Sequence, residues 1–190
     1  ASVFRNFPAK QHGIFVEVEE HIGPDQCDPV EILALLLSGA FDIVHYAGHG
    51  DYDKDNPAGS GWIFGKDCVL SAREIFRARK VPRLVFANAC FSAVTTRGQA
   101  LSADEQSKGL ASIAQAFFER GVSNYIGSGW PVNDEQATKL ARIFYEGLLT
   151  GKPICDALQA GRVEISGYGN TWGAYQHYGN PNEIVLKVDK

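Results

Sequence analysis

Two short segments carry residue types that could do nucleophilic chemistry together. Residues 45–50 read HYAGHG, and residues 87–92 read ANACFS. A cysteine thiolate is a nucleophile, and a nearby imidazole can take the thiol proton or protonate a leaving amine. His49 and Cys90 are therefore the candidate catalytic pair. The backbone N–H groups of Gly50 and Cys90 are the candidate donors to an oxyanion.

The positions of these segments favour this interpretation over the ordinary one. Alone, Cys90 would be a buried cysteine at a strand end, and His49 a loop histidine between glycines. However, each segment follows an apolar run, 41–46 or 84–87, that is typical of a buried strand. If these two strands are neighbours, about 4.8 Å apart, His49 and Cys90 emerge at the same edge of the sheet.

The remaining elements follow from apolar spacing and capping residues. Helices are expected to begin at Asp28, Ser71, Asn133 and Pro153, and a further helix is expected over about 110–121. Strands are expected at 14–18, 122–126 and 184–188, and residues 62–64 and 68–70 are expected to form a hairpin. The Gly- and Asp-rich stretch 47–61 predicts a loop. This order predicts an α/β fold: a three-layer α/β/α sandwich with a mainly parallel sheet, a small hairpin and a C-terminal edge strand.

Composition sets the broad class. The 190 residues are 45% hydrophobic and 21% charged, which predicts one globular domain over residues 1–190. The net charge of −4 argues against direct nucleic-acid binding, and no apolar run is long enough to span a membrane. No signal peptide is visible, which predicts a cytoplasmic protein whose four cysteines are reduced thiols. Cys27, Cys68 and Cys155 are expected to be structural. The chain begins at Ala1 and contains no Met, which suggests a processed or excised piece.

The polar stretch 91–107 directly after Cys90 is long for a connection. We expect it to be poorly ordered without a partner and to control access to the thiol.

Other chemistries fit less well. Residues 51–62 begin like a calcium loop but have Asn56 at the sixth position and Trp62 at the twelfth. His45 and His49 lack the helix and the intervening Glu of a zinc hydrolase, and His45 is expected to be buried and hydrogen-bonded. No phosphate-binding loop follows a strand, so no metal and no cofactor is expected.

Four motifs together resemble the CHAT domain family of caspase-like cysteine peptidases. They are HYAGHG at 45–50, NACFS at 88–92, GVSNYIGSGWPVND at 121–134 and WGAYQHYGNP at 172–181. The resemblance implies a caspase-like fold and a cysteine endopeptidase that hydrolyses a protein or peptide substrate through His49 and Cys90. It also implies control by a regulatory or sensor domain or chain.

The resemblance also suggests substrate-binding residues. Asn88, two residues before the nucleophile, would either line the S1 site or cap its own turn at the strand end. It is neutral, so it does not indicate an Arg or Lys preference as a carboxylate would. Ser128 and Gly129 fall in the stretch that pairs with substrate backbone as an added strand. Trp130 either walls an S2-like site or packs in the core. Asp134 is either a first-turn helix carboxylate or a contact for a basic substrate side chain.

Two other functions stay open on the sequence. A caspase-like fold could bind partners as an interaction scaffold without hydrolysing them. A weaker alternative is a flavodoxin-like binder of a small molecule, which the missing phosphate loop disfavours.

Overall fold

The computed structural model describes residues 10–11, 14–23, 28–53, 55–64, 68–77, 80–90 and 102–186. The chain divides into two compact units. The sheet unit comprises Ile22–Pro131 and Ala174–Gly179. The helical unit comprises Ala1–His21, Val132–Gly173 and Asn180–Lys190.

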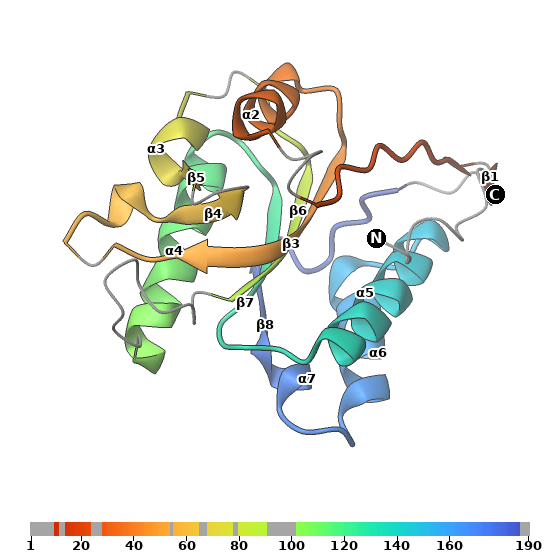
Figure 1. Ribbon diagram of the computed structural model, residues 1–190. Helices are drawn as coiled ribbons and strands as arrows, with labels where there is room; N and C mark the ends of the chain where they lie inside the picture. The colour runs from red at the N-terminus through yellow and green to blue at the C-terminus, as the bar shows by residue number, and fades with distance from the viewer. Residues whose placement is uncertain are drawn as a thin grey trace. The chain divides into compact units, whose positions relative to one another are not determined.

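A six-stranded sheet organises the sheet unit, in the order β5-β4-β3-β6-β7-β8 (Figure 1). Its strands are β3 (Ile43–Asp51), β4 (Gly61–Phe64), β5 (Cys68–Ser71), β6 (Leu84–Cys90), β7 (Asn124–Ser128) and β8 (Tyr175–Gly179). The central strands β3, β6 and β7 are parallel to one another, whereas β4, β5 and β8 pair antiparallel. The α/β class and the small β4–β5 hairpin are confirmed.

The expected mainly parallel sheet is therefore wrong in part, because the sheet is mixed. Among its described residues, the connection from β3 to β4 carries only the short 3-10 helix η1 (Pro57–Gly59). So short a link suits an antiparallel neighbour, because a parallel one requires a crossover of a dozen or more residues.

Several strand boundaries also differ from the sequence prediction. Strand β3 continues through residues 47–51, where a loop was expected, because it is paired with β6 on one side and β4 on the other. The expected strand at 184–188 is absent over residues 184–186, and residues 187–188 lie outside the described part. The C-terminal edge strand is instead β8, which pairs along the full length of β7. Over 14–18 only β2 (Ile14–Phe15) is strand, paired with β1 (Lys10–Gln11).

The described α-helices are α2 (Pro29–Ser38), α3 (Ala72–Ile75), α4 (Ala103–Glu119), α5 (Asp134–Leu149), α6 (Ile154–Ile165) and α7 (Thr171–Ala174). Of these, α2, α3, α5 and α6 begin where the sequence predicts, and α7 was not predicted. Asp28 Oδ1 accepts the N–H groups of Val30 at 2.9 Å and Glu31 at 3.0 Å, which caps α2. Asn133 Oδ1 accepts the Gln136 N–H at 3.1 Å and caps α5.

Helix α4 begins earlier than its apolar spacing suggested. Ser102 is its N-cap, and Glu105 returns a carboxylate to the Ser102 N–H at 2.8 Å. Residues 102–107 thus belong to the helix and its cap, and the expectation of a polar linker there is wrong. Residues 91–101 lie outside the described part.

An aromatic stack forms the core between the sheet and α4. Tyr46 stacks on Trp62 at 4.6 Å between ring centroids, Trp62 contacts Phe117 of α4 at 5.3 Å, and Phe117 contacts Tyr125 of β7 at 5.7 Å. This stack fixes β3, β4 and β7 against α4. We call this side of the sheet the core face.

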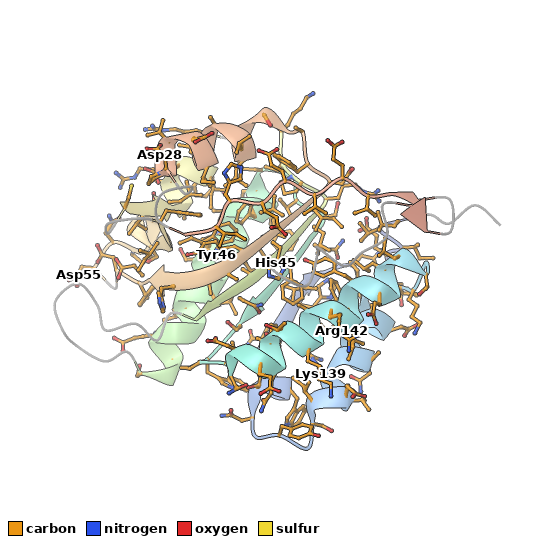
Figure 2. All side chains as sticks on the ribbon, turned by 45° about the vertical axis from the view of Figure 1, so that its right-hand side comes forward. Asp28, His45, Tyr46, Asp55, Lys139 and Arg142 are labelled. Atoms are coloured by element: carbon orange, nitrogen blue, oxygen red, sulfur yellow. The ribbon has the colours of Figure 1, made fainter. Side chains whose placement is uncertain are left out.

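In the helical unit, α5 and α6 pack closely. A Cβ at Gly147 would lie 2.8 Å from Ala157 Cβ, so glycine permits the approach. Lys139 Nζ lies 2.8 Å from Glu164 Oε1 and links the two helices at the surface (Figure 2). Within the described residues, no helix combines the length and apolar character needed to cross a membrane.

Candidate active site

The two candidate catalytic residues stand at paired positions on adjacent strands. Strands β3 and β6 are parallel neighbours, and His49 is the register partner of Cys90. Both residues lie where β3 and β6 approach their carboxyl ends. The side chain of Cys90 is outside the described part of the structure. The neighbouring strands on which the sequence argument depended are thus present.

His49 is held through its backbone while its side chain remains exposed. The hydroxyl of Tyr46 lies 2.9 Å from the His49 carbonyl oxygen and 2.7 Å from the Ile63 carbonyl oxygen of β4. A hydroxyl has one proton, so it donates to one carbonyl at a time. Tyr46 therefore ties the strand that carries His49 to the adjacent hairpin.

The absence of a side chain at Gly48 makes these contacts of the Tyr46 hydroxyl possible. A Cβ at Gly48 would collide with the Tyr46 hydroxyl oxygen and lie 2.7 Å from its ring carbon Cζ. Because glycine has no Cβ, the tyrosine ring can pass beneath residue 48 and reach the carbonyl of His49.

His45 lies on the opposite side of β3 from Tyr46 by strand alternation (Figure 2). Its ring stacks on Phe86 at 5.1 Å between centroids with 15° between the planes. Burial lowers the pKa of His45 to about 3. His45 is therefore a neutral packing residue at pH 7.

Asn88 has a defined partner that the sequence did not indicate. The Tyr175 hydroxyl of β8 donates to Asn88 Oδ1 at 2.7 Å. Tyr175 is buried and its ring contacts Phe86 at 5.6 Å between centroids. Asn88 itself is partly exposed.

The stretch after β7 is engaged within the sheet. Ser128 pairs with Tyr175, and the Gly129 N–H donates to the Ala174 carbonyl at 2.8 Å. The Gly129 N–H is thus engaged within the sheet unit. Trp130 is partly buried, and within the described residues its indole Nε1–H has no hydrogen-bond partner.

The last two candidates have different surroundings. Gly50 is buried in β3 opposite Trp62 of β4. Asp134 is the exposed first residue of α5 and belongs to the helical unit, where the helix N-terminus favours a carboxylate.

Sequence reasoning missed Tyr46, Gly48 and Tyr175 as parts of the site. Gly48 carried a weak signal, because a glycine inside a strand often marks a close approach of other atoms. Tyr175 lay in the fourth family-like motif but had no assigned role. Its contact with Asn88 depends on β8 pairing beside β7, which spacing along the chain does not reveal.

The fold and the paired residues define a class of protein. A mixed sheet with a His-Gly at the end of one parallel strand and a Cys at the end of its neighbour is the arrangement expected of a caspase-like fold. Among solved structures, the chain resembles the Arg-specific cysteine proteinase gingipain R, with a TM-score of 0.56 and 14% identity. The likeness covers 85% of this chain and 37% of the gingipain chain, and at this identity it shows the fold alone.

The family model of the CHAT domain matches residues 19–180. The chain belongs to the CHAT domain family. No curated protein matches the sequence.

Proposed function

We propose that this chain is a cysteine endopeptidase in which His49 and Cys90 form the catalytic dyad. The observation that carries the proposal is the parallel register that pairs His49 with Cys90. Residues paired in a parallel ladder direct their Cα–Cβ bonds to the same face of the sheet, with the strands about 4.8 Å apart. One substrate carbonyl can then be reached from both positions.

The chemistry divides into acylation and hydrolysis. His49 takes the Cys90 proton, and the thiolate attacks the scissile carbonyl carbon to form a tetrahedral oxyanion. The oxyanion collapses, the C–N bond breaks, and the imidazolium gives its proton to the leaving amine. Water, deprotonated by His49, then hydrolyses the thioester. The N–H groups of Gly50 and Cys90 are our candidates for stabilising the oxyanion.

The test compares two cysteine variants against a mixed peptide library and a thiol-reactive peptide. Cys90→Ala should abolish both cleavage and covalent labelling. Cys68→Ala, which changes an exposed free cysteine on β5, should retain both. Cleavage that persists in Cys90→Ala would rule out the dyad.

Regulation forms part of the proposal. We expect a partner or sensor domain to switch the peptidase on, in the cytoplasm, with a protein as the natural substrate. Peptide binding without cleavage, in the presence of candidate activators, would instead favour a catalytically silent interaction scaffold.

A further inference from the structure

Three polar residues lie at one level across strands β6, β7 and β8. Ser128 is the register partner of Tyr175. Ala87 and Gly127 are register partners in the parallel β6–β7 ladder. Asn88 directly follows Ala87, and Ser128 directly follows Gly127. We call Asn88, Ser128 and Tyr175 the amide cluster. All three belong to the sheet unit.

Tyr175 orients the amide of Asn88. Two strand spacings, about 9.6 Å, separate β8 from β6, and the length of a tyrosine side chain spans much of that distance. Its hydroxyl reaches Asn88 Oδ1 at 2.7 Å. Burial raises the pKa of Tyr175, so the phenol stays protonated and remains a donor at neutral pH.

This contact determines what Asn88 can offer a ligand. A carboxamide has one acceptor oxygen and one donor NH2 group. Because Tyr175 occupies the oxygen, the NH2 group of the partly exposed Asn88 presents its two donors. Ser128 adds a second unused group: it is 1% exposed, and its hydroxyl has no hydrogen-bond partner within the described residues. A buried hydroxyl left without a partner is costly, so a ligand group that meets it is favoured.

The described part of the sheet face that carries the amide cluster holds no carboxylate, ammonium or guanidinium on β6, β7 and β8. The described side chains on the same face of β6, β7 and β8 include no Asp, Glu, Lys or Arg: they are Leu84, Phe86, Asn88, Asn124, Ile126, Ser128, Tyr175 and His177. A guanidinium or ammonium entering here would lose its hydration without meeting a carboxylate. A neutral carbonyl would find donors.

We propose that the amide cluster recognises the P1 side chain of the substrate and selects a carboxamide, Gln or Asn, over Arg and Lys. The inference rests on the proposed peptidase function and extends it to substrate class. Asn88 is the recognising residue, and Tyr175 is a positioning residue that acts through it.

The experiment uses peptide libraries that fix P1 as Gln, Asn, Leu, Glu, Arg or Lys and randomise the flanking positions. Hydrolysis is measured with the unmodified chain. Binding is measured by fluorescence anisotropy with Cys90→Ala, which requires no chemistry. In both assays we expect P1 Gln or Asn to exceed P1 Arg and Lys at least tenfold.

Two variants and a matched control test the residues. Asn88→Asp supplies a carboxylate and should reverse the preference toward Arg and Lys. Tyr175→Phe removes the hydrogen bond that orients the Asn88 amide. It should reduce the preference for P1 Gln or Asn over Arg and Lys to less than threefold, and the change should appear in KM rather than in kcat. Tyr178→Phe is the control, because its hydroxyl donates to Gln176 Oε1 at 2.8 Å on the other face of the same strand. It should leave the preference unchanged.

The outcomes separate this inference from the proposed function. Selective binding of Gln or Asn peptides without hydrolysis would support the amide cluster and remove the peptidase. Hydrolysis with equal or better use of Arg, insensitive to Asn88→Asp, would overturn the amide cluster and leave the peptidase in place. Absence of peptide binding at every P1 residue would overturn the inference.

Discussion

Tyr46 and Gly48 form a coupled pair that sets the position of the His49 backbone. The Tyr46 ring is buried in the core face, stacked on Trp62, and its hydroxyl lies within hydrogen-bond distance of two carbonyl oxygens. That geometry exists only because residue 48 has no Cβ. The glycine and the tyrosine are therefore expected to tolerate substitution together better than separately.

A double-mutant cycle tests this coupling. Gly48→Ala alone should lower the free energy of unfolding by roughly 1–3 kcal/mol, because the added Cβ displaces the Tyr46 ring. In a Tyr46→Leu background the same change should cost clearly less, since the ring and hydroxyl are gone. Urea unfolding of the four proteins measures the coupling free energy. Equal costs of Gly48→Ala in both backgrounds would show that the two residues act independently.

At the scale of elements, helix α5 depends on small residues where it meets α6. An ideal Cβ placed on Gly147 would lie 2.8 Å from Ala157 Cβ and 3.1 Å from Ala157 Cα. Glycine is a poor helix former, costing about 1 kcal/mol relative to alanine. Its presence in the last turn of α5 is therefore explained by the close approach of α6 rather than by helix propensity.

Substitution of Gly147 separates the cost of overpacking against α6 from the gain in helix propensity. Gly147→Ala should destabilise the protein by roughly 1 kcal/mol net, because overpacking outweighs the gain in helix propensity. The double variant with Ala157→Gly removes the opposing Cβ and should recover most of the loss. Gly167→Ala, where nothing lies within 4 Å, is the control and should be neutral or slightly stabilising. A neutral or stabilising Gly147→Ala in urea unfolding would contradict tight α5–α6 packing.

At the scale of the whole molecule, the desolvated ring of His45 links stability to pH. Burial lowers its pKa to about 3, against an ordinary value of about 6.5 in an unfolded chain. Between these values the unfolded chain binds a proton that the folded chain excludes. Stability contributed by the neutral ring is therefore complete above about pH 6.5 and is lost as the pH falls toward 3.

The prediction concerns how steeply the free energy of unfolding changes with pH. Between pH 6 and 4, the free energy of unfolding of the unmodified chain should fall more steeply than that of His45→Asn, by up to about 1.4 kcal/mol per pH unit. His49→Asn changes an exposed ring on the same strand and serves as the control. Chemical denaturation at several pH values gives the slopes. Parallel curves for the unmodified chain and His45→Asn would show that His45 does not carry this linkage.

The sequence by itself determined the features that depend on local chemistry. Asp28 and Asn133 identified helix starts because their side-chain oxygens accept hydrogen bonds from free N–H groups nearby in the chain. The hairpin of β4 and β5 followed from two apolar runs separated by a short polar turn. His49 and Cys90 stood out because their residue types and strand-end positions fit one kind of chemistry.

Only the tertiary structure decided the features that depend on strand order. The extension of β3 through Gly48 and Gly50 requires partners on both sides, although isolated glycines disfavour a strand. The choice of β8 as the edge strand, in place of residues 184–188, brought Tyr175 within reach of Asn88. These contacts join segments up to 87 residues apart, and spacing along a chain holds no information about which distant strand will lie beside which.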